Sequence, residues 1–222
     1  MKSSNTTAIQ KAFTQQAPGF ESSRMNFTKQ EYLDYAISKI CPAKSDSVLE
    51  AAAGTCVCGR AIAPYAGSVT CLDLTPAMLS IGKAEAEPPF AEMVRVLKPG
   101  GRLVMIDMEA AEEGLRPIED EIEILRDPSH IHTLSKAEIL ALYEKHGLSV
   151  DVCDTVRMPM KLQNWLAHTE TPRNIQADII ARMEEDINGG TKTGFYPYHS
   201  QGEIQFDHRW VLIIGIKRAV SF

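Results

Sequence analysis

Two acidic residues, each at the end of an apolar stretch, are the residues of this chain best placed to bind a ligand. Residues 47–50 read as a short buried strand ending in Glu50, and residues 68–73 as a second one ending in Asp73. Small residues follow Glu50, and Gly54 lies nineteen residues before Asp73. This pattern is typical of a βαβ unit that binds a nucleotide, in which the second acid accepts hydrogen bonds from ribose hydroxyls. The ligand is therefore expected to contain adenosine.

The first acid discriminates between adenosine ligands. In a dinucleotide site Glu50 would lie beside the pyrophosphate, and two anions about 5 Å apart repel by several kcal/mol at an effective dielectric near 20. S-adenosylmethionine instead carries an ammonium and a sulfonium, which a carboxylate attracts. The spacing of Ala52, Gly54 and Val57 also matches the dinucleotide pattern Gly-x-Gly-x-x-Gly poorly. These residues favour S-adenosylmethionine as the cofactor.

Two stretches of the chain resemble the class I S-adenosylmethionine-dependent methyltransferases, in particular small-molecule enzymes similar to those of ubiquinone and menaquinone biosynthesis. The loop beginning at Glu50 follows the family's acid-x-Gly-x-Gly-x-Gly pattern, with Ala52 and Cys56 in place of two glycines. Residues 90–107 are similar to the family's helix, Leu-Lys-Pro-Gly-Gly turn and fifth strand. The resemblance implies an α/β fold with a Rossmann-like doubly wound sheet, mostly parallel, and an antiparallel C-terminal strand.

The resemblance also implies one methyltransferase domain over residues 1–222, a length and composition ordinary for a single globular domain. Within it we expect an N-terminal lid or arm at 1–27, the cofactor-binding core at 28–108, substrate-side helical insertions with the sixth strand at 109–203, and the final strand at 204–222. In the family the first segment folds over the cofactor as a lid. A loosely packed arm is an equal alternative.

Residue roles follow from the same resemblance. Glu50 would bind the cofactor's ammonium, Gly54 would admit its methionine portion and Asp73 would bind its ribose. Leu74 and Met78 flank that aspartate, where the family places an apolar residue against the adenine ring, although a plain core role is the alternative. The predicted cofactor-binding residues are Glu50, Ala52, Gly54, Cys56, Asp73, Leu74, Met78 and Phe20.

A polar loop, Arg126–His132, follows the expected fifth strand and is the candidate for the substrate side, because ligands of open α/β sheets bind beyond the carboxyl ends of the strands. Similar methyltransferases carry an Arg-Asp-x-Ser-His loop at this place. His130 is the catalytic candidate, and it or His132 would be needed as a base only if the acceptor arrives protonated. The alternative is a structural loop in which Asp127 caps and His130 bonds to backbone.

Composition and net charge limit the kinds of partner that the chain is expected to bind. With a net charge of −6 and no basic patch, the chain is not expected to bind nucleic acid or an anionic membrane. It has neither a signal peptide nor a stretch long enough to span a bilayer, so we expect a cytoplasmic protein, with a homodimer left open. Five cysteines fit free thiols in a reducing compartment. The spacing of Cys56, Cys58 and Cys71 is not that of a zinc site, so no metal is predicted.

Periodicity and turn signals predict the remaining elements. Thr28 and Glu31 read as a capping box that opens a helix ending at Cys41, whereas the segment 10–26 looks too irregular for a long helix. Further helices are expected at 59–65, 77–87, 90–97, 118–125, 135–146 and 172–188, with strands at 148–156 and 204–217.

The junction at Glu87 and Pro88 is too short for the fold. Helices expected to end at 87 and to begin at 90 lie on opposite faces of the sheet in the family. Crossing a sheet needs about 20 Å, but two or three residues span at most about 10 Å. The family has a strand, a helix and its central fourth strand there, including an acid that holds the adenine amine. We expect that residues are omitted at this junction; a naturally shortened chain is the alternative.

Together these residues predict methyl transfer from S-adenosylmethionine to a small molecule. The enzyme would act mainly by orienting the two reactants, which can supply about 7 to 11 kcal/mol of the barrier. A methyltransferase-like protein that binds S-adenosylmethionine without turnover is the first alternative. A nicotinamide-dependent oxidoreductase is a weaker one. The acceptor is not identified by the sequence.

Overall fold

The computed structural model describes residues 2–21, 28–73, 90–130 and 132–218. The predicted helix at 77–87, Leu74, Met78 and the Glu87–Pro88 junction lie outside these residues. The chain divides into two compact units. The N-terminal unit comprises residues 1–87, 127–129 and 164–171, and the C-terminal unit comprises residues 88–126, 130–163 and 172–222.

The N-terminal unit is built on a parallel pair of strands, β1 (Ser47–Ala51) and β2 (Ser68–Leu72). Helix α3 (Val57–Ile62) connects them, so the predicted βαβ unit is confirmed. The register places Glu50 opposite Cys71. Because the strands are parallel, their carboxyl ends lie at the same edge of the sheet, which brings Glu50 and Asp73 together at one end.

The helices that precede the βαβ unit depart from the sequence expectation in two ways. Helix α1 runs from Lys2 to Gln16 and is followed by a 3-10 turn, η1 (Ala17–Gly19), so the expectation of an irregular segment was wrong for residues 10–16. The proline that suggested irregularity lies in the first turn of η1, where its missing N–H costs nothing. Helix α2 (Gln30–Ile40) begins after Lys29, which supplies no side-chain cap, so the predicted capping box was wrong.

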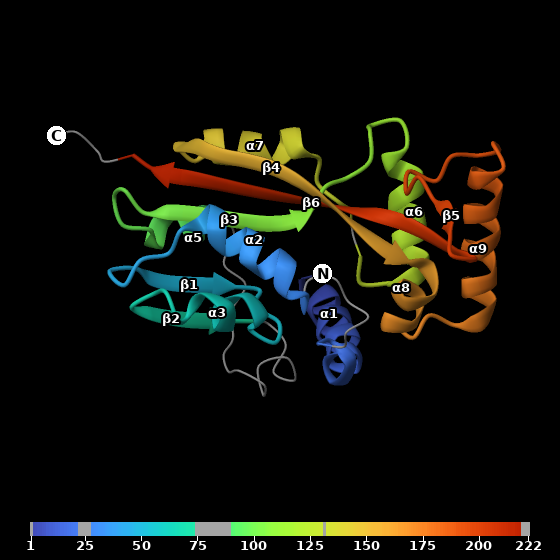
Figure 1. Ribbon diagram of the computed structural model, residues 1–222, viewed down its shortest axis with the longest axis horizontal. Helices are drawn as coiled ribbons and strands as arrows, with labels where there is room; N and C mark the ends of the chain where they lie inside the picture. The colour runs from blue at the N-terminus through green and yellow to red at the C-terminus, as the bar shows by residue number, and fades with distance from the viewer. Residues whose placement is uncertain (1, 22–27, 74–89, 131, 219–222) are drawn as a thin grey trace. The chain divides into compact units, whose positions relative to one another are not determined.

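The C-terminal unit contains a sheet ordered β3-β6-β4, with β5 paired to β6 (Figure 1). Strand β6 (Glu203–Lys217) is antiparallel to β3 (Arg102–Met108), to β4 (Leu148–Lys161) and to the short β5 (Tyr198–Ser200). Strands β3 and β4 are therefore parallel to each other, and the last long strand is the antiparallel one. The predicted Rossmann-like α/β fold with an antiparallel C-terminal strand is confirmed.

Most helices of the C-terminal unit lie close to the positions that sequence periodicity predicted. The helices are α5 (Phe90–Val96), α6 (Arg116–Arg126), α7 (Lys136–Lys145) and α9 (Arg173–Ile187). Ser135 and Glu138 form the predicted capping box of α7. Helix α8 (Leu162–His168), whose last residues belong to the N-terminal unit, and strand β5 were not predicted, because both are short and carry no turn signal.

The Leu-Lys-Pro-Gly-Gly turn ties α5 to the sheet. Gly100 adopts a left-handed backbone with φ of 76° and donates its N–H to the carbonyl of Lys217 at 2.8 Å. The Lys217 ammonium donates to the carbonyls of Val94 at 2.7 Å and Leu97 at 2.9 Å, which satisfies the C-terminal end of the helix. Behind the turn lies a cluster of buried residues shared by α5, α7 and the three long strands: Val94, Leu103, Ile139, Tyr143, Leu148, Val211 and Ile213.

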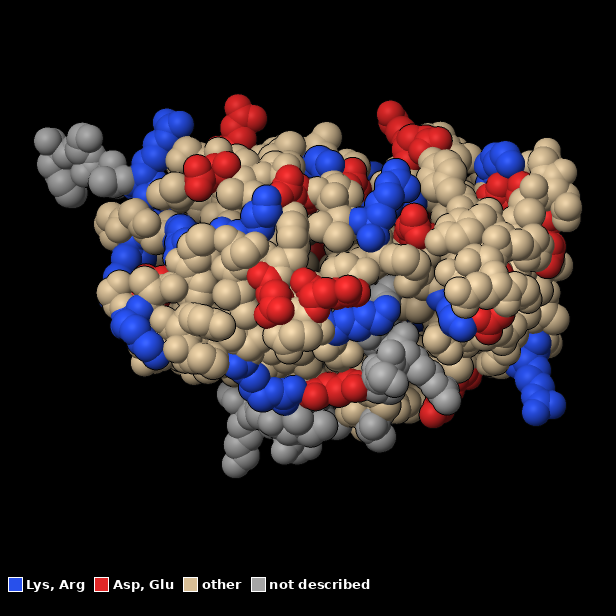
Figure 2. Space-filling model, viewed as in Figure 1, with Lys and Arg blue, Asp and Glu red and all other residues tan. Residues whose placement is uncertain are grey.

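The surface mixes both signs of charge. On the face shown in Figure 2, acidic and basic side chains alternate and neither sign gathers into a large patch. No helix among the described residues is long and apolar enough to cross a bilayer.

His208, on β6, makes the C-terminal unit sensitive to acid. Burial lowers the pKa of His208 to about 3, with Arg126 and Arg209 acting in the same direction, and its Nε2 is buried without a hydrogen-bond partner among the described residues. An unfolded histidine titrates near pH 6.5. The stability contributed by neutral His208 is therefore fully present above about pH 6.5 and is lost as the pH falls toward 3. Between pH 7 and pH 5 the loss is about 2 kcal/mol.

Urea unfolding at these two pH values tests this expectation. In His208→Gln the drop in unfolding free energy should shrink by most of that amount, because no histidine must be charged. His199→Gln is the matched control, since His199 is exposed on β5. Equal pH dependence in all three proteins would show that His208 is not the responsible group.

Candidate functional site

The loop between β1 and α3 keeps the backbone of a glycine loop although two of its glycines are replaced. Ala52, Gly54 and Cys56 all have left-handed backbones, with φ of 55°, 52° and 62°. These are the three positions at which the acid-x-Gly-x-Gly-x-Gly pattern has glycine. Alanine and cysteine cost about 1 to 2 kcal/mol each in this conformation, so the fold retains the loop shape against local preference.

Asp73, immediately after β2, is held against this loop. Its Oδ2 accepts a hydrogen bond from the Gly54 N–H at 2.7 Å, and the neighbouring Ala53 N–H donates to the Leu72 carbonyl at 2.9 Å. The two contacts join the end of β2 to the middle of the loop. Asp73 and Gly54, both predicted to bind the cofactor, therefore lie together.

Glu50 makes its contacts with the first turn of α3 and with strand β2. Its Oε2 accepts hydrogen bonds from the Gly59 N–H at 2.9 Å and from the Cys71 thiol at 3.2 Å. Burial raises the pKa of Glu50, and these two donors and Arg60 oppose the shift. A carboxylate at the first turn of a helix is stabilised by the unpaired N–H groups there. Glu50 therefore orders the loop, a role that its predicted contact with an ammonium did not include.

Gly59 is a site residue that the motif did not indicate. A Cβ on Gly59 would lie 2.5 Å from Glu50 Oε2 and 2.6 Å from Cys71 Sγ. Only glycine therefore lets the Glu50 carboxylate reach the backbone. A glycine inside a short helix costs about 1 kcal/mol relative to alanine, and that unfavourable placement was the available signal.

Replacing Gly59 by alanine is expected to push the Glu50 carboxylate off the helix. Both crowded atoms end flexible side chains, so the protein should fold with a loss of about 1 kcal/mol, the value of one hydrogen bond. Binding of S-adenosylmethionine should weaken as much as it does in Glu50→Ala. Calorimetry measures both effects. Gly114→Ala is the control, because a Cβ there meets nothing within 4 Å; affinity at the wild-type level in Gly59→Ala would contradict this prediction.

Phe20 lies against the loop from the N-terminal side. A Cβ on Gly54 would come within 3.2 Å of its ring. The ring also packs edge-on against Phe13, at 6.4 Å between centroids, and in a tilted arrangement against His168, at 5.6 Å. Phe20, one of the predicted cofactor-binding residues, thus lies beside Gly54. His168 was not singled out in the sequence, because nothing near it in the chain marks a site.

Cysteine side chains pack in and beside the loop between β1 and α3. Cys56 and Ala53 are buried and pack with the partly buried Cys71. Burial raises the pKa of Cys58 to about 11 and also raises the pKa of Cys71. All five cysteines are free thiols. No group of three or more metal-binding side chains occurs in the part of the chain that the structure describes.

The polar loop after α6 is held by contacts of its own. His130 Nε2 lies 2.9 Å from Asp120 Oδ1, which also accepts the Thr133 N–H at 2.9 Å. Asp127 accepts from the backbone and the hydroxyl of Ser129, at 2.9 and 2.7 Å. These contacts of Asp127 agree with the alternative of a structural loop, whereas His130 bonds a carboxylate rather than backbone. An aspartate that fixes one ring nitrogen leaves the other to face a ligand.

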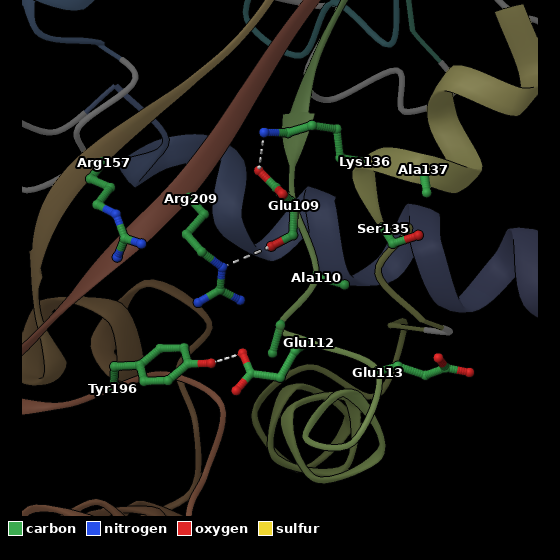
Figure 3. A pocket seen from close by; sticks show the side chains of 11 residues that line it. Glu109, Ala110, Glu112, Glu113, Ser135, Lys136, Ala137, Arg157, Tyr196 and Arg209 are labelled. Carbon is green, nitrogen blue, oxygen red and sulfur yellow. Dashed lines mark hydrogen bonds and ion pairs between the residues drawn. The ribbon is translucent and has the colours of Figure 1, made fainter.

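A cavity of about 620 Å³ opens in the C-terminal unit where β3 ends. Figure 3 shows side chains of both charges around it. It is lined by residues 109–113 after β3, by residues 135–137 at the start of α7, and by Arg157, Tyr196 and Arg209. This is a common size for a small-molecule site. The sequence did not predict it, since its lining comes from five separate segments.

No protein-family model matches the chain. Among curated proteins it is 32% identical over 105 residues to the uncharacterized protein YafE of Escherichia coli, and 30% identical over 132 residues to the uncharacterized methyltransferase YcgJ of Bacillus subtilis. These matches cover 47% and 57% of this chain and 50% and 51% of the relatives. The chain thus spans about half the length of the curated relatives that it matches.

Solved structures extend the likeness over most of the chain. The crystal structure of YcgJ superposes with a TM-score of 0.74 at 22% identity, over 86% of this chain and all of that one. Geranyl diphosphate C-methyltransferase from Streptomyces coelicolor, in complex with Mg²⁺, geranyl diphosphate and S-adenosyl-L-homocysteine, superposes with a TM-score of 0.53 at 16% identity, over 84% and 78%. The chain therefore has the fold of these methyltransferases, as the sequence predicted.

Proposed function

We propose that this protein is a class I methyltransferase that transfers the methyl group of S-adenosylmethionine to a small-molecule acceptor. The observation that carries the proposal is the loop after β1. Three alternate residues there are left-handed and Asp73 bonds to the Gly54 N–H. Methyltransferases among the sequence and structure relatives support it.

The position of Glu50 argues against a nicotinamide dinucleotide. The pyrophosphate of such a cofactor takes the N-terminal N–H groups of the helix that follows the first strand. In this chain the Glu50 carboxylate accepts the Gly59 N–H in that first turn, so a pyrophosphate would meet both an anion and an occupied donor. A cofactor whose charged groups are cationic meets neither obstacle. The oxidoreductase alternative therefore loses support.

The chain's contribution to the reaction is chiefly binding and orientation. Bound S-adenosylmethionine supplies an electrophilic methyl group. Asp73 would accept hydrogen bonds from the ribose, and Glu50 would attract the ammonium from the loop it orders. Phe20 lies against Gly54, and its ring would exclude water from that side of the loop. Holding the acceptor in line supplies a large share of the rate acceleration.

Calorimetry with S-adenosylmethionine and with NADH, followed by measurement of S-adenosylhomocysteine release in a metabolite mixture, tests the proposal. We expect binding of the first ligand only, and release that depends on a component of the mixture. Binding without release under any condition would favour the alternative of a protein that binds the cofactor without turnover. That alternative has its own support in the shortness of the chain between β2 and α5.

Intact mass decides whether the chain is naturally short. A mass near 24.5 kDa would mean that the sequence is complete as printed between Glu87 and Pro88 and would strengthen the alternative without turnover. A larger mass would mean that residues are omitted.

His130 is proposed to face the acceptor, with Asp120 fixing its ring. His130→Ala should then bind S-adenosylmethionine normally and lose about 100-fold or more in methyl transfer, the range of general base catalysis. The rate and the cofactor affinity are measured on the same preparation. His199→Gln controls for loss of an exposed histidine. A normal rate in His130→Ala would make the contact with Asp120 purely structural.

We further propose a cytoplasmic location, a single methyltransferase domain over residues 1–222 and a lid role for residues 1–27. Limited proteolysis with and without S-adenosylhomocysteine tests the lid, since a closed lid should protect the first 27 residues from cleavage.

A further inference from the structure

Arginine side chains meet on one wall of the cavity after β3. Arg157 of β4 and Arg209 of β6 are direct partners in the antiparallel register, and both line the cavity. In Figure 3 both guanidinium groups extend toward the side of the cavity where Tyr196 and Glu112 lie. Like charges directly opposite on paired strands are destabilising. A negatively charged group beside the two arginines would offset this repulsion.

One of the two arginines already has its partner. Arg209 Nη2 lies 2.5 Å from Glu119 Oε1, and Nη1 donates to the Gly194 carbonyl at 3.1 Å. Arg209 Nε donates to the Glu109 carbonyl at 3.3 Å. Its side chain is only 10% exposed. The guanidinium of Arg209 is thus held by groups of the protein itself. Arg209 lines the cavity, but each of its guanidinium nitrogens already donates a hydrogen bond.

Arg157 differs from its neighbour. Its side chain is exposed, and within the described part of the chain its guanidinium has no hydrogen bond or ion pair. The planar guanidinium fork suits bidentate binding of a carboxylate or a phosphate. Arg157 therefore presents an unused anion-binding group inside a cavity of small-molecule size.

The acidic residues that line the cavity either have partners other than Arg157 or point away from it. Glu109 accepts the Thr155 hydroxyl at 2.8 Å and lies 3.5 Å from the Lys136 ammonium. Glu112 accepts the hydroxyl of Tyr196. Glu113 points away from both arginines in Figure 3. No acid that lines the cavity pairs with Arg157.

We propose that this cavity binds the anionic end of the methyl acceptor and that Arg157 holds the anionic group there, a carboxylate or a phosphate. The proposal rests on the proposed methyltransferase function and names its substrate class. The cavity begins at the carboxyl end of β3, where ligands of open α/β sheets bind. Tyr196 keeps a left-handed backbone, with φ of 53°, and its ring forms part of the cavity wall.

Fractionation of the metabolite mixture on an anion-exchange resin gives the first test. The fraction that supports S-adenosylhomocysteine release should be retained at low salt, and treatment with phosphatase separates a phosphate acceptor from a carboxylate. Arg157→Met should raise the acceptor KM tenfold or more, as expected for one lost charge-assisted pair, without changing S-adenosylmethionine affinity. Arg157→Lys should recover part of the loss. Arg173→Met, at an exposed arginine on α9, is the matched control.

Direct binding gives a second test that does not require turnover. Benzoate and phenyl phosphate are titrated into the wild-type protein and into Arg157→Met in the presence of S-adenosylhomocysteine, with benzyl alcohol as the neutral control. At least one anion should bind the wild type tenfold or more tightly than the variant. An active fraction that passes the resin unretained, or anion binding and KM within twofold of wild type in Arg157→Met, overturns the inference. Absence of S-adenosylmethionine binding overturns the proposed function, and the titrations then decide the anion site by themselves.

Discussion

Replacing Asp73 by alanine should weaken S-adenosylmethionine binding about tenfold to a hundredfold. One charge-assisted hydrogen bond is worth about 1.5 to 3 kcal/mol, which corresponds to that range of affinity. The same carboxylate also holds the Gly54 N–H at 2.7 Å, so its loss loosens the loop. Calorimetry at pH 7.5 measures the change.

Glu50→Ala should weaken binding in the same range and separately from Asp73→Ala. Because burial raises the pKa of Glu50, wild-type affinity should begin to fall at a higher pH than an ordinary glutamate would cause. Glu50→Gln should remove that pH dependence. Glu31→Gln, an exposed acid on α2, is the control. Wild-type affinity in both folded alanine variants would remove the cofactor assignment.

Arg209→Met should destabilise the C-terminal unit by about 3 to 5 kcal/mol, the usual effect of removing one partner of a buried ion pair. Arg209 and Glu119 are 10% and 4% exposed, with 2.5 Å between the paired atoms. Glu119 also accepts the Ala111 N–H at 2.6 Å, so its carboxylate cannot turn to solvent. Urea unfolding at pH 7.5 measures the loss.

The loss should be smaller in acid. Burial already raises the pKa of Glu119, while Arg209 and the Ala111 N–H oppose the shift, and removing the arginine raises it further. A group with a raised folded pKa favours the folded state at low pH and loses that contribution as the pH rises through the folded pKa. Adding Glu119→Gln should restore part of the stability, and Arg173→Met should change little. A loss below about 1 kcal/mol at pH 7.5 would contradict the buried-pair assignment.

Local patterns in the sequence were enough to predict much of the proposed cofactor-binding region. The apolar runs ending in Glu50 and Asp73 sufficed to predict two parallel strands and the loop between them, because strand alternation and small-residue turns are short-range features. The helix, turn and strand at 90–107 were predicted for the same reason. Helix α1 was missed because a polar stretch with weak periodicity gives no signal. The residues around Leu74, Met78 and Glu87 stay predictions.

Only the tertiary structure decided which distant residues meet. Gly59 matters because the Glu50 carboxylate reaches its backbone, a contact that no motif encodes. The cavity joins residues from five separate segments, and its two arginines face each other through the register of β4 on β6. That register shifts at an irregularity between Val150 and Val152. Since a shift of one residue sends every following side chain to the other face of a sheet, the pairing of Arg157 with Arg209 depends on how the strands align and not on either strand's own sequence.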